Sequence, residues 1–138
     1  MKLIIAGGRS YTFTQKDFER LDAIHEKFGV AEVVCGTPWD PKKKKPPVGA
    51  DQWGAFWANE RGIPVKDMPA EWDNIARPGA IIRYRRDGTP YDVVAGPYRN
   101  GRMAEYGDAA ALFPGGTGTA SMYREAQKAG IQIFDYRE

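Results

Sequence analysis

The chain of 138 residues contains one cysteine, Cys35, and one histidine, His25. A single cysteine excludes an internal disulfide and a zinc site built from several cysteines. A single histidine likewise excludes a histidine cluster around a metal ion. The sequence therefore predicts no metal site, and we also expect no bound cofactor.

Long hydrophobic runs and a strong charge of one sign are also missing. No apolar run approaches the roughly 20 residues of a membrane-spanning helix, and the N-terminal MKLIIAGG has no hydrophobic segment of signal-peptide length. The formal net charge of only +2 does not by itself indicate a nucleic-acid partner. We expect a soluble, cytoplasmic protein without a membrane partner, folded as one domain over residues 1–138.

Apolar runs typical of buried strands alternate with segments of helical periodicity. Strands are expected at 2–6, 31–36, 63–69, 108–113 and 131–136, and helices after Thr14, at 49–62, near 97–107 and at 117–129. This alternation predicts an α/β fold with a mostly parallel, Rossmann-like sheet and helices on both faces. In such sheets, ligands bind beyond the carboxyl ends of the strands, where the strand order reverses.

Two stretches interrupt the alternation. Residues 37–48 combine four consecutive lysines, at 42–45, with four prolines, which indicates an extended surface loop. Residues 71–96 contain two turn signals between the β-like runs IIRYR and YDVV. They predict a small β-hairpin insertion around residues 80–95.

The stretch FPGGTGTASM at 113–122 joins an expected strand to an expected helix. Glycines let the backbone approach a ligand closely, and the amides at a helix N-terminus attract anions. Thr117, Thr119 and Ser121 add hydroxyl donors, so we expect phosphate to bind at residues 115–119. The alternative is a glycine-rich turn that holds no ligand.

Five short motifs follow one another in order: GGR at 7–9, GAD at 49–51, PAEW at 69–72, GPYRN at 96–100 with Met103, and PGGTGT at 114–119. In this order they resemble the SLOG superfamily, which includes the Lonely Guy phosphoribohydrolases and the fold of DNA-processing protein A. They look most similar to a small branch, common in phages and bacteria, that carries GGR, GAD, PADW, GPxRNxxM and PGGxGT. The resemblance does not extend to the lysine loop or to most of residues 73–95. It implies a Rossmann-like sheet, a nucleotide-type ligand and, frequently, a homodimer.

The resemblance and the loop chemistry together suggest the ligand-binding residues. Arg99 stands where the phosphoribohydrolases place an arginine before their final loop, and it would clamp a phosphate or else pair with a surface aspartate. Asp51 would accept hydrogen bonds from ribose hydroxyls, or serve only as an acidic residue of a first helical turn. Tyr11 would stack on a base or cover the core. The full predicted set is Gly7, Gly8, Arg9, Gly49, Asp51, Arg99, Asn100, Gly115, Gly116, Thr117, Gly118, Thr119 and Ser121.

One departure from the family pattern bears on catalysis. The Lonely Guy enzymes carry a glutamate shortly after PGGxGT, where this chain has Ser121 and Met122. A serine hydroxyl is a poor base at neutral pH. We therefore expect binding rather than cleavage, as by a sensor, carrier or sequestering protein, with a phosphoribohydrolase-like enzyme as the alternative and the catalytic residues unknown.

A nucleic-acid-binding module is the second alternative. KKKK at 42–45 and RYRR at 83–86, with Trp39, Tyr84 and Tyr91, could follow a single strand by charge and stacking. Alternatively these loops form a lid or a subunit contact. The stripe Trp53, Phe56 and Trp57 is typical of a core or of a dimer interface, Cys35 is expected to be buried, and His25 is expected to be exposed.

Overall fold

The computed structural model describes all residues from 1 to 138. Five parallel strands form one sheet in the order β3-β2-β1-β6-β7. The strands are β1 (Lys2–Ala6), β2 (Glu32–Cys35), β3 (Val65–Asp67), β6 (Ala109–Leu112) and β7 (Gln132–Asp135). The prediction of a Rossmann-like parallel α/β fold is confirmed.

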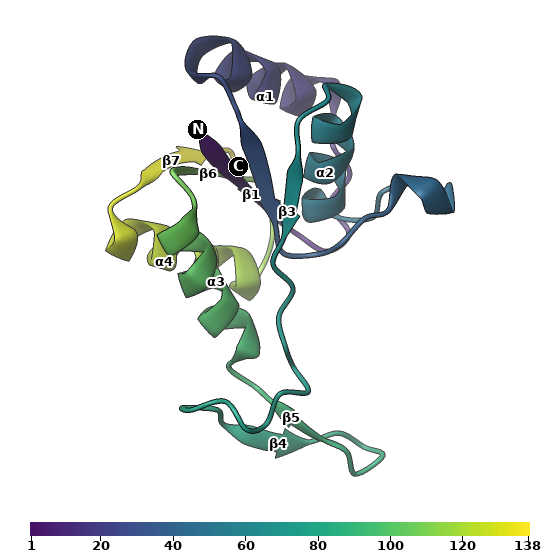
Figure 1. Cartoon of the computed structure of the whole chain (residues 1–138), viewed down its shortest axis with the longest axis vertical. Coiled ribbons are helices and arrows are strands. Elements are labelled where there is room, and N and C mark those ends of the chain that lie inside the picture. The colour runs from purple at the N-terminus through teal and green to yellow at the C-terminus, as the bar shows by residue number, and fades with distance from the viewer.

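Four helices cover the two faces of this sheet (Figure 1). They are α1 (Gln15–Phe28), α2 (Ala50–Glu60), α3 (Ala95–Tyr106) and α4 (Thr117–Ala129). Alternate strand residues face opposite sides, so β1 sends Leu3 and Ile5 toward α1 and α2 and sends Ile4 toward α3 and α4. The core is therefore two apolar layers, one on each face.

Small residues bring the helices close to the sheet. The strand β6 contributes three fully buried alanines and a leucine. A Cβ atom on Gly54 of α2 would lie 2.6 Å from Cγ2 of Ile5. Because that distance is far below van der Waals contact, only glycine fits where α2 crosses β1.

Helix α1 begins and ends at the residues that the sequence indicates. Thr14 and Asp17 form a capping box at its start, and Gly29 ends it in the left-handed conformation at φ 72°. The expectation of an exposed His25 is wrong: its ring is half-buried against Trp57, and its Nδ1 accepts the Val30 amide at 2.9 Å. His25 thereby binds an amide just beyond the end of the helix.

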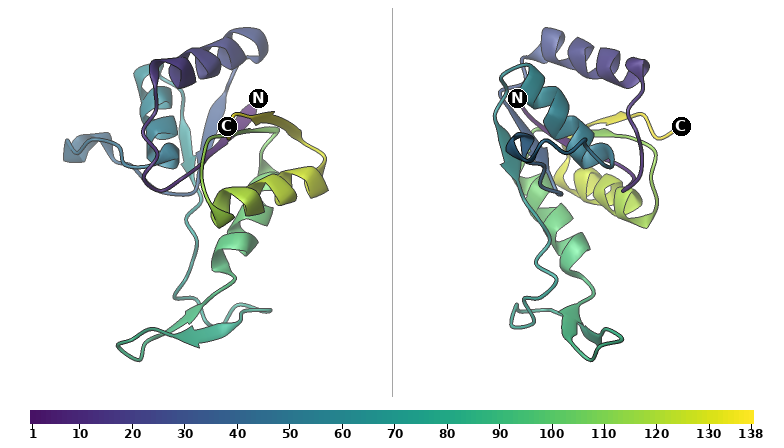
Figure 2. Two further views of the ribbon diagram at one scale, coloured as in Figure 1. Left: turned by 180° about the vertical axis from the view of Figure 1, so that it is seen from behind. Right: turned by 90° about the vertical axis from the view of Figure 1, so that its right-hand side faces the viewer.

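The predicted insertion is a separate two-stranded hairpin, β4 (Ile82–Tyr84) and β5 (Pro90–Asp92), which pair antiparallel. We call residues 70–94 the arm. The arm projects from the end of the sheet opposite α1 in all views (Figures 1 and 2). Neither of its strands pairs with a strand of the five-stranded sheet.

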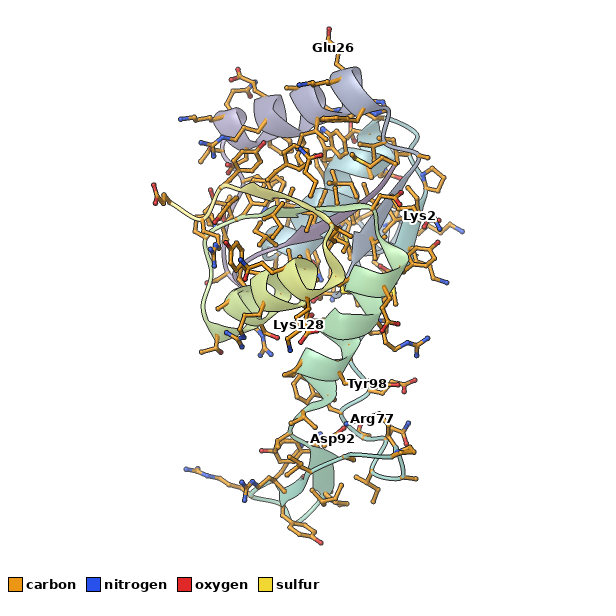
Figure 3. The ribbon with its side chains drawn as sticks, turned by 90° about the vertical axis from the view of Figure 1, so that its left-hand side faces the viewer. Lys2, Glu26, Arg77, Asp92, Tyr98 and Lys128 are labelled. Atoms are coloured by element: carbon orange, nitrogen blue, oxygen red, sulfur yellow. The ribbon has the colours of Figure 1, made fainter.

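The root of the arm is fixed by a buried ion pair. Arg77 donates from Nε at 3.1 Å and from Nη2 at 2.8 Å to Asp92, which is fully buried (Figure 3). The amides of Ile81 and Val94 donate to the second oxygen of Asp92, each at 3.1 Å. Desolvation acts to raise the pKa of Asp92, but these donors outweigh it and the pKa is lowered. The guanidinium of Arg77 also lies 4.1 Å above the ring of Tyr98 in α3, which joins the arm to the body.

None of the helices is long and apolar enough to cross a membrane.

Candidate functional site

Three glycine-bearing loops meet at the carboxyl ends of the strands. The Gly8 amide donates to the Pro114 carbonyl at 2.8 Å, and the Ala50 amide donates to the Gly8 carbonyl at 3.0 Å. The strand order reverses between β1 and β6, because β2 and β3 extend to one side of β1 and β6 and β7 to the other. The loops therefore meet at the position where open α/β sheets bind ligands.

We use the name crevice for the group of residues 7–9, Gly36, Asp51, Arg99 and 115–119 at this end of the sheet. Two glycines at its border with α2 are required by close packing. A Cβ on Gly7 would lie 2.6 Å from Cβ of Ala50, and a Cβ on Gly49, which has φ +86°, would lie 2.5 Å from the Arg9 carbonyl oxygen. Gly49 therefore fixes the loop after β1 against the start of α2.

The N-terminus of α4 has unpaired amides. Its first intrahelical hydrogen bond runs from Ala120 to the Gly116 carbonyl at 3.1 Å, and no side chain caps the helix. The amides of Thr117, Gly118 and Thr119 have no partner within the chain. This helix end therefore combines free donors with the positive end of the helix dipole.

The glycines around these amides differ in the space beside them. A Cβ on Gly115 would collide with Thr119 and lie 2.7 Å from the Gly8 amide nitrogen. A Cβ on Gly116 or Gly118 would meet nothing within 4 Å, and Gly116 has an ordinary φ of −101°. Gly115 is thus fixed by packing, whereas the space above Gly116 and Gly118 is open.

Asn100 and Ser121 lie behind the loop rather than on its open side. Both are buried, and Asn100 Nδ2 donates to Ser121 Oγ at 3.2 Å and to the Gly118 carbonyl at 3.4 Å. Thr119 is buried as well, whereas Thr117 is exposed. Asn100 and Ser121 therefore position the loop, and only Thr117 offers an exposed hydroxyl.

Arg99 connects the ends of two strands to α3. Its Nη1 donates to the carbonyls of Gly36 at 2.8 Å and Met68 at 3.1 Å, and its Nε donates to Oδ1 of Asn100 at 3.0 Å. Its Nη2 makes no hydrogen bond within the chain. Arg99 therefore has one nitrogen left for a ligand, while the other two hold the backbone.

Asp51 lies beside Arg99 and bears a perturbed carboxyl group. Its Oδ2 accepts the Gly36 amide at 3.2 Å. Burial raises the pKa of Asp51 to about 6, although the nearby Arg99 and the Gly36 amide act to lower it. Burial is also the main cause that lowers the pKa of Arg99, and the neighbouring charge of Arg9 adds to it. The crevice therefore contains two guanidinium groups and one carboxyl that titrates near neutral pH.

Tyr11 covers the core. Its ring stacks on Phe113 with centroids 6.3 Å apart, and its hydroxyl donates to Asp17 Oδ2 at 2.6 Å. Burial and this hydrogen bond raise the pKa of Tyr11 to about 12. The hydroxyl of Tyr11 thus already donates its hydrogen bond to a residue of α1.

A hollow of about 250 Å³ lies on the other side of Arg99, between β3, α3 and the start of the arm. Its charged lining is mostly basic, with two acidic residues: Lys66, Arg77, Arg99 and Arg102 with Asp67 and Glu71. Sequence reasoning missed this hollow. Arg102 follows Arg99 by three residues on the same helix face, which was the available signal, but Lys66 and Arg77 come from distant parts of the chain.

No carboxylate replaces the glutamate that is missing after PGGTGT. Met122 and Ser121 are both buried. The carboxylate of Glu125 lies toward Gly101 of α3, where a Cβ would be 3.3 Å away from it. The only carboxyl in the crevice is that of Asp51.

The two basic segments occupy separate projections (Figure 1). The lysines belong to a loop beside α2 that contains a short 3-10 helix, η1 (Pro41–Lys43), and the arginines belong to the arm. Trp39 donates its Nε1 to the Lys45 carbonyl and packs on Phe56, and Tyr91 lies under Arg85 at 4.9 Å. Of the three aromatic residues in these two segments, Trp39, Tyr84 and Tyr91, only Tyr84 is exposed.

No family model matches the chain, and neither the curated proteins nor the solved structures include a significant match. The class of protein is thus defined by the fold itself, a Rossmann-like parallel α/β domain with an added hairpin.

Proposed function

We propose that the chain binds a nucleotide or nucleotide-derived small molecule in the crevice, with a phosphate group at the N-terminus of α4. The single observation that carries the proposal is the set of unpaired amides of Thr117, Gly118 and Thr119 beside open space. They stand where the strand order reverses, which favours a ligand over an unoccupied turn.

The charges of the crevice support an anionic ligand. The guanidinium of Arg9 and the Nη2 of Arg99, which makes no hydrogen bond within the chain, bring positive charge to the same end of the sheet. Asp51 opposes an anion when it is ionised, but its pKa of about 6 means that an anionic ligand needs only a small further shift to keep it protonated. A protonated carboxyl can also donate a hydrogen bond to a ribose oxygen.

Thermal unfolding in the presence of candidate ligands tests this function. The panel contains the ribonucleoside 5′-monophosphates, ADP-ribose, dinucleotides and inorganic phosphate. A ligand at 100 times its dissociation constant adds about 2.7 kcal/mol, a shift of several degrees for a domain of this size. A variant with Lys42, Lys43, Lys44 and Lys45 changed to alanine should respond like the wild type. If no compound raises the unfolding temperature, the function is wrong.

Cleavage of the bound nucleotide is a second candidate, favoured by one observation. Asp51 is a carboxyl that can exchange a proton near neutral pH inside the crevice. Incubation of the stabilising nucleotide should then release free base and ribose 5-phosphate, detectable by chromatography. Asp51→Asn should retain binding and abolish release. Intact nucleotide after long incubation with the wild type would leave binding as the function.

A further inference from the structure

The two outer edges of the hairpin differ in whether their outward-facing backbone groups are available to pair with another strand. On the β5 side, the Asp92 amide donates to the Trp72 carbonyl at 2.8 Å, and Pro90 has no amide hydrogen. Segments that block or bury an edge in this way prevent pairing with another strand. The β5 edge is therefore closed.

The β4 edge is open. The Val93 amide donates to the Ile81 carbonyl and the Arg85 amide to the Thr89 carbonyl, each at 2.9 Å, and Arg83 lies opposite Tyr91. The backbone groups of Ile81, Arg83 and Arg85 thus face β5. In an antiparallel ladder the residues between them, Ile82 and Tyr84, point their amides and carbonyls away from the partner strand. No backbone or side-chain group of the chain bonds the Ile82 or Tyr84 amide from outside the hairpin.

The large hydrophobic side chains along β4 and just before it are unusually exposed. Ile81 is 49% exposed, Ile82 37% and Tyr84 71%. An isolated two-stranded hairpin is marginally stable in water, and a further strand is the common remedy. The arm is nevertheless held firmly at its root by the buried Arg77–Asp92 pair. A fixed hairpin with one bare edge is suited to accept a strand.

We infer that this strand is β4 of a second copy of the chain, paired antiparallel about Arg83. In that register Ile82 lies opposite Tyr84 of the other copy, and Tyr84 lies opposite Ile82. Both pairs have their backbone groups directed outward, so each exchanges two hydrogen bonds across the twofold axis. Aromatic and β-branched residues are favourable cross-strand neighbours. The edge is therefore complementary to itself, and the product is the four-stranded sheet β5-β4-β4-β5.

Charge within the arm is compatible with association but limits its strength. The arm carries four arginines and four carboxylates, so two arms do not repel by net charge. The exception is Arg83, which meets its own copy across the axis on the other face of the sheet. Since strand pairing alone buries less surface than the roughly 1,200 Å² of a stable complex, we expect a weak dimer with a dissociation constant between about 5 and 500 µM. This inference is independent of the proposed ligand.

Sedimentation velocity from about 5 to 500 µM without ligand tests the inference. Wild type should change from monomer to dimer across this range. Tyr84→Pro removes an outward amide without removing a β4–β5 hydrogen bond and should stay monomeric, while Tyr84→Phe should dimerise like the wild type. A wild type that stays monomeric, or a Tyr84→Pro dimer of wild-type strength, overturns the proposal.

A charge-swap experiment tests the register and does not depend on the proline variant. Arg83→Glu alone should dimerise no better than the wild type, because two glutamates then face each other. A mixture of Arg83→Glu with wild type should form heterodimers roughly tenfold more tightly than either homodimer, since opposite charges replace like charges. Absence of this preference overturns pairing about Arg83.

Discussion

Gly118→Asp should separate ligand binding from stability, because a carboxylate at this position stabilises the helix and repels the ligand. Residue 118 lies in the first turn of α4, and a Cβ atom there would meet no group from elsewhere in the chain within 4 Å. The new carboxylate interacts favourably with the unpaired amides and the helix dipole. It therefore lies beside the place that we assign to the phosphate.

The expected magnitudes have opposite signs for folding and binding. Replacing a helical glycine and adding a negative charge at the helix start should raise the unfolding free energy by about 1 kcal/mol. A carboxylate about 5 Å from a phosphate charge opposes binding by roughly 1 to 3 kcal/mol per unit charge at effective dielectric constants between about 80 and 20. Binding should thus weaken between about fivefold and a hundredfold.

Chemical denaturation measures the first effect and isothermal titration calorimetry the second, with the most stabilising compound of the panel. Gly118→Ala is the matched control, because it adds a methyl group without charge and keeps every amide. It should be as stable as the wild type or more stable, and it should lose less affinity than Gly118→Asp. A stabilised Gly118→Asp protein that binds the ligand as tightly as the wild type would refute the placement of the phosphate.

Further consequences concern the carboxyl of the crevice, the helix packing, the arm and Arg99. The pKa of Asp51 is raised from 3.8 to about 6 in the folded chain, so the free energy of unfolding should be highest below pH 4 and fall by about 3 kcal/mol as the pH rises through 6. Denaturation curves of Asp51→Asn should lack this decline, and identical pH profiles of the two proteins would contradict the prediction. Gly54→Ala should lower the unfolding free energy by about 1 to 3 kcal/mol through overpacking against β1, in contrast to Gly118→Ala, and an unchanged denaturation midpoint would show that α2 can shift. Asp92→Ala should leave the thermal unfolding of the body unchanged but speed tryptic cleavage within the arm, and equal cleavage rates would mean that the buried pair does not hold the root. Arg99→Lys should lower both stability and affinity, because a single ammonium cannot reach the carbonyls that Nη1 binds and also present a free donor; an unaffected unfolding temperature would argue against its structural part.

Much of the fold follows from local sequence signals. The capping pattern at Thr14, the glycines at 29 and 130, and the unbroken apolar runs locate α1, α4 and the buried strands closely. The convergence of the glycine loops also follows from the sequence, because each comes directly after a parallel strand. Every strand of the sheet after β1 is shorter than expected, and β3 is shortened most, because apolar residues continue into the loops on either side of it.

The roles of individual side chains could be predicted less well from the sequence. Arg99 holds two backbone carbonyls because β2 and β3 end beside α3, a proximity that no spacing in the sequence encodes. Asn100 and Ser121 are turned behind the loop for the same kind of reason, since α3 packs on α4. The hydrogen bond that His25 accepts at the end of α1 could not be predicted from the sequence, because its donor is the Val30 amide, which lies beyond Gly29.

The most direct measurement of the central claim is a ¹⁵N-resolved NMR titration of the labelled protein with the stabilising nucleotide and, separately, with inorganic phosphate. The account predicts that the amide signals of Thr117, Gly118 and Thr119 shift most with both ligands, and that the nucleotide alone also shifts signals around Asp51. Shifts concentrated in the lysine loop or in the arm, with the amides of α4 unmoved, would contradict it.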